Sequence, residues 1–112
     1  MSKPEVLLVI TNLPDRATAE RVAEALVTSG VAACINILAE CTSVYQWEGK
    51  LNHTCEVPLL IKTTRAAYPR LESALRELHP YELPELIAVP VTAGLPAYLD
   101  WVAQETQPRN AE

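Results

Sequence analysis

The segment from residue 79 to residue 85 carries the side chains best suited to chemistry, in the order His-Pro-Tyr-Glu-Leu-Pro-Glu. His79 follows a helical pattern and precedes a proline, so its ring is held at a helix end and can offer a neutral nitrogen to a borderline or soft metal. Tyr81, Glu82 and Glu85 add oxygen donors. The other interpretation is that His79 caps the helix end or packs there. The sequence alone leaves both open.

A second possible ligand set depends on the pairing of two strands. If Gly49 lies near the turn, Cys41 falls close to Val57 and diagonal to Cys55, while His53 and Cys55 lie on one face of a strand, two residues apart. Two thiolates and an imidazole suit copper(I) or zinc. Plain packing is the alternative.

Cysteine usage limits the other possibilities. The chain has three cysteines, an odd number, and none belongs to a C-x-x-C pair. This argues against a disulfide framework and against a zinc site made of four thiolates. We expect the cysteines to be reduced and partly buried, as free cysteines usually are.

Aromatic and charged residues near Gly49 suggest an interface. Tyr45 and Trp47 could anchor a partner protein, or they could be buried against a neighbouring subunit. A small polar cleft between subunits would need charges of both signs, which the chain offers in Lys50, Lys62, Glu48 and Glu85. An ordinary ion-paired rim explains these four charges equally well.

Enzyme motifs are missing from the sequence. It contains no G-x-S-x-G, no phosphate-binding Gly-rich loop and only three glycines in its 112 residues, and neither histidine lies in a known catalytic motif. We therefore expect no catalysis and no obligatory cofactor.

Charge and hydropathy limit the classes of partner that the protein can bind. The formal net charge of −5 and the scattered basic residues argue against nucleic acid. No apolar run is long enough to span a membrane, and no signal peptide is recognisable, so we expect a cytoplasmic protein.

The first half of the chain predicts a strand, a helix and a long hairpin. Residues 6–10 form a continuous apolar run typical of a buried strand. A helix should begin after Asp15, a good N-cap, and stop before Gly30. Residues 31–38 and 42–48 read as extended, with a bend or bulge near residues 39 and 40. Gly49 then allows a tight turn.

The return strand is unusually long. Alternation continues from residue 51 to residue 63, with one apolar face and one wet face. At ~3.3 Å per residue this strand would measure roughly 40 Å, more than a small domain can cover. Part of the hairpin should therefore project beyond the core.

The second half predicts a helix, a strand and a last helix. The second helix should start near Tyr68, with Pro69 in its first turn, and end before Pro80. Residues 84–91 read as a final strand, and the two prolines that bracket it suggest a boundary or an edge. A C-terminal helix should follow at residues 96–105, with Tyr98 and Trp101 in its apolar stripe, and the tail from about residue 106 should be loose.

This order of elements predicts one α+β domain over residues 1–112. It matches the split βαβ plan, in which two helices cover one face of a four-stranded antiparallel sheet. The other face exposes apolar side chains and the projecting hairpin has unpaired edge groups, and copies of the same chain are the simplest elements that could cover both. We therefore expect a homo-oligomer.

Two segments resemble those of a known family. Residues 43–51, Ser-Val-Tyr-Gln-Trp-Glu-Gly-Lys-Leu, resemble the S-x-Y-x-W-x-G-K hairpin of the CutA divalent-cation tolerance proteins. Residues 79–86 resemble that family's H-P-Y-E-x-P-E segment. The stretches 32–37 and 60–63 are weaker matches in the same order. The resemblance thus covers nearly the whole chain.

The resemblance implies a ferredoxin-like subunit in a homotrimer, whose hairpins extend onto neighbouring subunits. It also implies a cytosolic, non-catalytic protein linked to copper and other divalent metals, with a sensing role like that of the PII signal-transduction proteins. The copper site proposed for the family adds a Cys at the end of the first strand and a second His. Here Thr11 and Leu78 stand at those positions, so His79 alone is carried over. A trimeric scaffold that presents a partner surface is the alternative function.

Overall fold

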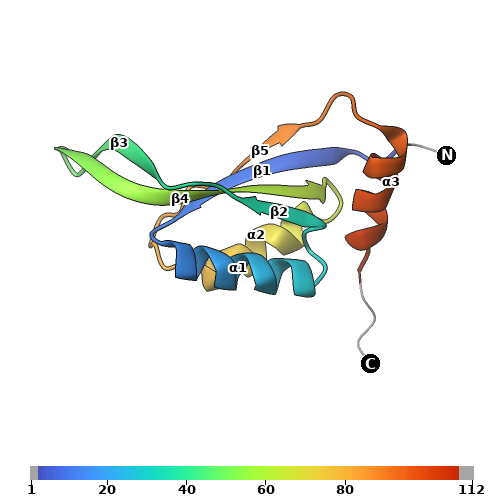
Figure 1. Cartoon of the computed structure of the whole chain (residues 1–112), viewed down its shortest axis with the longest axis horizontal. Helices are drawn as coiled ribbons and strands as arrows, with labels where there is room; N and C mark the ends of the chain where they lie inside the picture. The colour runs from blue at the N-terminus through green and yellow to red at the C-terminus, as the bar shows by residue number, and fades with distance from the viewer. Residues whose placement is uncertain (1–2, 109–112) are drawn as a thin grey trace.

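The computed structural model describes residues 3–108, which form five strands and three helices in the predicted order (Figure 1). The elements are β1 (Val6–Leu13), α1 (Arg16–Thr28), β2 (Cys34–Ile37), β3 (Cys41–Trp47), β4 (Lys50–Thr64), α2 (Tyr68–Leu78), β5 (Ile87–Pro90) and α3 (Pro96–Glu105). The C-terminal helix has the bounds that the sequence predicted.

The sheet has the strand order β2-β4-β1-β5, and each neighbouring pair is antiparallel. Helices α1 and α2 lie together on one side of it (Figure 1). The α+β prediction and the split βαβ, or ferredoxin-like, topology are therefore confirmed for the single chain. The opposite side of the sheet, which we call the open face, carries neither α1 nor α2.

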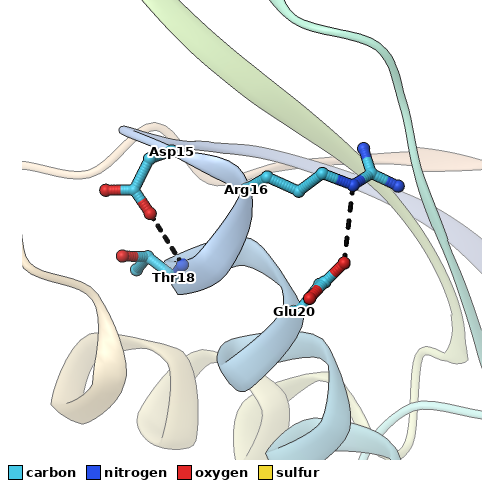
Figure 2. Close-up of polar contacts among 4 residues, drawn as sticks. All are labelled: Asp15, Arg16, Thr18 and Glu20. Atoms are coloured by element: carbon cyan, nitrogen blue, oxygen red, sulfur yellow. Dashed lines mark hydrogen bonds and ion pairs between the residues drawn. The ribbon is translucent and has the colours of Figure 1, made fainter.

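Local signals set both ends of α1. The Asp15 carboxylate accepts a hydrogen bond from the Thr18 backbone N–H at 2.8 Å, which satisfies one of the free donors of the first turn (Figure 2). This bond also holds the pKa of Asp15 below its ordinary value. Gly30, just beyond the helix, has a φ of 78°. The predicted cap and stop are both confirmed.

The main core lies between the sheet and the two helices. Strand β4 contributes Val57, Leu59 and Ile61, all on the side of the helices. The helices contribute Ala19, Val22, Leu26, Leu71 and Leu75. Alternation along the inner part of β4 thus predicts its buried face correctly.

Helix α3 packs at the other end of the molecule from the hairpin (Figure 1). Val102 forms a small second core with Val6 and Ala33. Tyr98 and Trp101, which we expected in the buried stripe, are exposed and pack against each other with ring centroids 5.7 Å apart. The helix therefore buries only part of its apolar side within one chain.

The packed region extends further than expected at the C-terminus. Thr106 is 2% exposed, and its hydroxyl donates to the Val102 carbonyl at 2.8 Å. Its own carbonyl accepts from the Arg70 guanidinium at 2.7 Å. The prediction of a loose tail from about residue 106 is therefore wrong at Thr106, while residues 109–112 lie outside the described part of the chain.

The hairpin of β3 and β4 projects from the body, as predicted (Figure 1). Trp47 pairs with Lys50 across a two-residue turn, in which Glu48 has a φ of 52° and Gly49 a φ of 78°. Positive φ at both positions is the type I′ turn, whose twist matches that of a hairpin. The long axis of the molecule reaches 50 Å.

A bulge separates β2 from β3, and the register of β3 on β4 differs from the predicted one by one residue. Ile37 pairs with Leu59 and Cys41 with Glu56, so the stretch 38–40 faces only Pro58 and Val57 on β4. The two-residue turn, with Trp47 opposite Lys50, puts Cys41 opposite Glu56, one residue away from the predicted register with Val57. A shift of one residue moves a side chain to the other face.

The last strand is shorter than predicted. We expected residues 84–91, but β5 covers Ile87–Pro90 and pairs only with β1 at the edge of the sheet. The segment before it is held differently, because the Thr11 hydroxyl donates to the Glu85 carbonyl at 2.6 Å. The predicted edge position is confirmed.

Candidate functional site

Several predicted site residues meet at the base of the hairpin, which we call the hairpin corner. It is formed by Asn12 at the end of β1, Glu56 of β4, His79 after α2, and Tyr81. Pro80 helps to end α2, and His79 then takes an extended conformation with φ −76° and ψ 132°. This turn directs the imidazole toward β1.

Both ring nitrogens of His79 are engaged. Nδ1 accepts a hydrogen bond from the Tyr81 backbone N–H at 3.2 Å, so Nε2 carries the proton and donates to the Asn12 carbonyl at 2.7 Å. The residue is 7% exposed. Burial lowers the pKa of His79, an effect that the Asn12 carbonyl and the Glu56 carboxylate only partly offset. Through its hydrogen bond to Asn12, the neutral ring links the end of α2 to β1.

These contacts bear on the metal hypothesis for His79. A metal ion would have to displace one of the two hydrogen bonds to reach a ring nitrogen. Thr11 and Leu78 do not supply the missing ligands, because Thr11 is buried and bonded to Glu85, and Leu78 has an aliphatic side chain. The geometry favours the alternative in which His79 packs and joins elements.

Glu56 is the residue of this corner that the sequence analysis missed. The alternating pattern predicted a solvent-exposed side chain for Glu56, yet this residue is only 8% exposed. Burial raises the pKa of Tyr81 to about 12, and the Glu56 carboxylate beside the phenol adds to the effect. Tyr81 therefore keeps its proton and can donate it in a hydrogen bond. The corner offers a carboxylate and a phenol to a polar ligand.

Glu82 and Glu85 lie near this corner and are exposed. The Glu85 carboxylate accepts from the Asn12 side-chain amide at 2.8 Å. The rings of His79 and Tyr81 are in contact, with centroids 4.8 Å apart. The predicted segment therefore folds back against the end of β1, and its acidic side chains belong to the same end of the sheet.

Lys62 belongs to a different cluster. Its ammonium donates to the Asn36 side-chain carbonyl and lies 3.9 Å from the Cys34 sulfur. Burial raises the pKa of Tyr98, and nearby Cys34 contributes. Lys50 and Lys62 lie twelve residues apart on one extended strand, roughly 40 Å. They cannot line the same cleft within one chain.

Tyr45, Trp47 and Lys50 are in the outer part of the hairpin. Tyr45 and Trp47 are both exposed in the single chain, and Trp47 reaches 48%. Val44 and Leu51 are also exposed, at 59% and 64%. Pairing places Tyr45 and Trp47 on one face of the hairpin and Val44 and Leu51 on the other. Apolar side chains therefore meet solvent on both faces.

The structure does not bring Cys41, His53 and Cys55 together. Cys41 pairs with Glu56, whereas Cys55 pairs with Thr42 and His53 with Val44. Cys41 thus points to the face opposite the other two. Within residues 3–108, no group of three or more His, Cys, Asp or Glu side chains could hold a metal ion. Only the His53 and Cys55 pair remains of the predicted set.

A shallow cleft lies at the opposite end from the hairpin and contains none of the predicted site residues. Its volume is about 490 Å³, and its lining includes Pro4, Glu5, Arg65, Arg70, Thr106 and Pro108. Arg65 pairs with Glu5 at 3.1 Å. Among the helices of residues 3–108, none is long and apolar enough to cross a membrane.

Comparison with known proteins gives consistent results. The model of the CutA1 divalent ion tolerance protein family matches residues 7–105. The divalent-cation tolerance protein CutA of Thermus thermophilus is 40% identical over 99 residues, which are 88% of this chain and 96% of that protein. Protein CutA of Mus musculus is 43% identical over 94 residues, 84% of this chain, but only 53% of the mouse protein is covered. The chain thus spans about half of that mammalian relative.

Solved structures agree with the sequence matches. The divalent cation tolerance protein from Thermus thermophilus superposes with a TM-score of 0.89 at 39% identity, covering 91% of this chain and 99% of that one. The periplasmic divalent cation tolerance protein CutA from Archaeoglobus fulgidus gives 0.87 at 28% identity, covering 91% and 99%. Family model, sequence identity and fold all agree, and this chain belongs to the CutA1 divalent ion tolerance protein family.

Proposed function

We propose that this member of the family works as a cytosolic homotrimer whose hairpins dock onto neighbouring subunits. The observation that carries the proposal is the exposure of Tyr45 and Trp47 on a hairpin that projects from its own body (Figure 1). Exposed aromatic residues near a protruding turn are typical of an interface. The number three comes from the resemblance to the CutA family.

The open face of the sheet supports self-association. Leu8 and Ile10 of β1 pair with Val89 and Ile87 of β5, and the two β5 side chains are exposed. Leu60 of β4 lies beside Ile10 and is only partly buried. A contiguous apolar surface of this kind is costly in water, and a sister subunit is the simplest cover.

The trimer would place a ligand cleft at the hairpin corner. Glu56, Tyr81, Glu82 and Glu85 would line this cleft with oxygen atoms. They do not form a complete metal site within one chain, so a divalent cation, including copper, or a polar small molecule would also need ligands from the neighbouring subunit. Binding there would change how the hairpin docks, which is how the chain would act as a PII-like sensor in divalent-cation tolerance. The proposed role requires no catalysis.

Calorimetric titration with copper and zinc tests the ligand cleft. We expect binding tighter than about 1 mM in a Cys55→Ser parent, which lacks the exposed thiol of the hairpin and serves as the wild type in this comparison. The Glu56→Gln variant, which keeps the shape of the side chain but removes its charge, should bind at least about tenfold more weakly. Glu72→Gln on the exposed side of α2 is the matched control and should bind like the wild type.

Light scattering tests the assembly. At micromolar concentration we expect a mass of three chains, and a Tyr45→Ser/Trp47→Ser variant should dissociate because it loses the docking surface. Circular dichroism must show that the variant is still folded. A stable wild-type monomer would contradict the proposal.

A trimeric scaffold that presents a partner surface is the second candidate function. The occupied ring nitrogens of His79 favour it, since the one family metal ligand that this chain retains already has two hydrogen-bond partners. Metal titration separates the two candidates. If the intact trimer binds neither metal more tightly than a millimolar background, the result would support the scaffold function.

A further inference from the structure

The outer face of the hairpin pairs a thiol with an imidazole. His53 and Cys55 are two residues apart on β4, and their partners on β3 are Val44 and Thr42. Directly paired residues share a face of an antiparallel ribbon, so these four side chains point the same way. We call this surface the His53–Cys55 face. It lies opposite the face that carries Tyr45, Trp47 and Glu56.

Both side chains are free to bind. His53 and Cys55 are exposed, and within residues 3–108 neither side chain takes part in a hydrogen bond, in contrast to the buried and doubly bonded His79. Residues two apart in a strand are about 6.6 Å apart along it. An imidazole and a thiolate so placed can converge on one ion at bond lengths of about 2.0–2.3 Å.

One chain cannot complete the coordination. Thr42 and Val44, which face the pair, supply no strong metal ligand, and Cys41 points the other way. A tetrahedral zinc or copper(I) site needs about four ligands, so two positions stay open. The missing ligands must come from outside the chain.

The surroundings of the pair point to a second copy as the source. Val44 and Leu51, 59% and 64% exposed, belong to the same face. Two such faces related by a two-fold axis would bring two histidines and two cysteines around one ion and bury four apolar side chains. The hairpin projects from the body, so its own helices do not block this contact (Figure 1).

We propose that His53 and Cys55 form half of a zinc or copper(I) site that is completed by the same two residues of a second copy. This inference rests on the cation role proposed above, but it does not require the trimer. A closed three-fold assembly cannot contain a two-fold contact between its subunits, so the metal would join hairpins of different assemblies. Binding would therefore raise the mass of the particle.

Cobalt(II) provides the test, because it occupies zinc sites and shows a sulfur-to-cobalt charge-transfer band when a thiolate binds it. In a titration without oxygen, with a phosphine reductant to exclude disulfides, the charge-transfer band should saturate at one cobalt per two chains. Cys55→Ser should abolish the band, and His53→Gln should weaken binding by about tenfold or more. Cys41→Ser, on the opposite face of the same hairpin, is the matched control and should behave like the wild type.

Light scattering supplies the second readout. Zinc at one equivalent per two chains should raise the particle mass of the wild type but not of Cys55→Ser, and chelation by EDTA should reverse the rise. A band that saturates at one cobalt per chain, a band that survives in Cys55→Ser, or an unchanged mass would overturn the proposal. The metal-free mass tests the trimer independently, since a monomer there would contradict the trimer alone.

Discussion

The two halves of β4 differ in what surrounds them, although they belong to one continuous strand. From Val57 to Thr64 the strand pairs with β1 on one side and lies over α1 and α2. From Lys50 to Glu56 it pairs only with β3. Leu59 is fully buried in the inner half, whereas Leu51 in the outer half is 64% exposed. Side-chain pattern alone does not bury a residue, because a covering element is also needed.

Truncation of one leucine in each half gives the largest expected contrast. Leu59→Ala should lower the free energy of unfolding by about 2–5 kcal/mol, because it leaves a cavity in a packed core. Leu51→Ala should change it by less than about 0.5 kcal/mol in metal-free protein, as surface substitutions do. Urea denaturation at fixed protein concentration measures both. Equal losses of unfolding free energy in the two variants would show that another subunit already covers the outer half of β4.

Protonation of His79 tests the junction between the halves. His79→Gln should cost about 1–3 kcal/mol at pH 8, because it leaves buried hydrogen-bond partners unsatisfied. Burial lowers the pKa of His79 below 6.5, so on acidification the unfolded state takes up the proton first and the folded state loses stability. The cost of the substitution should therefore shrink as the pH falls from about 8 to about 5.

His53→Gln is the control for that experiment. His53 lies on the hairpin and is exposed, so its substitution should change the unfolding free energy at pH 8 by less than about 0.5 kcal/mol. A cost of His79→Gln that stays constant across the same pH range would mean that the ring titrates equally in both states, which would contradict the neutral, doubly bonded imidazole.

The turn at the tip should give the smallest effect. Gly49 has a φ of 78°, and an added Cβ would meet no atom within 4 Å, so Gly49→Ala introduces backbone strain without a clash. We expect a loss of about 1–2 kcal/mol in unfolding free energy. Hydrogen exchange of the outer β3 and β4 amides should rise more than that of inner β4. Equal rises would mean that the two halves open as one unit.

Local signals made most of the fold predictable. Asp15, Gly49 and Pro80 each act through their own backbone or an immediate neighbour, so their positions mark a cap, a turn and a helix end without knowledge of the tertiary structure. The length of alternation likewise predicted the projecting hairpin.

Features that depend on distant pairing were less predictable. The bulge at residues 38–40 was anticipated, but the length of the turn was not. Only Glu48 and Gly49 form the turn, and the resulting shift of one residue means that the predicted register put Cys41 on the wrong face. Glu56 was missed because Tyr81 and His79, which lie beside it, come from a different part of the chain. The engagement of both His79 nitrogens depends on Asn12, 67 residues away.

The shallow cleft behind α3 has a practical consequence for handling this protein. Pro4 and Pro108 both line it, so the two ends of the described chain lie close together, at the pole that is farthest from the hairpin (Figure 1). An affinity tag, fluorophore or fusion partner attached at either end would sit far from the β-ribbon. Within one chain, a short peptide linker between Pro4 and Pro108 would permit circular permutation.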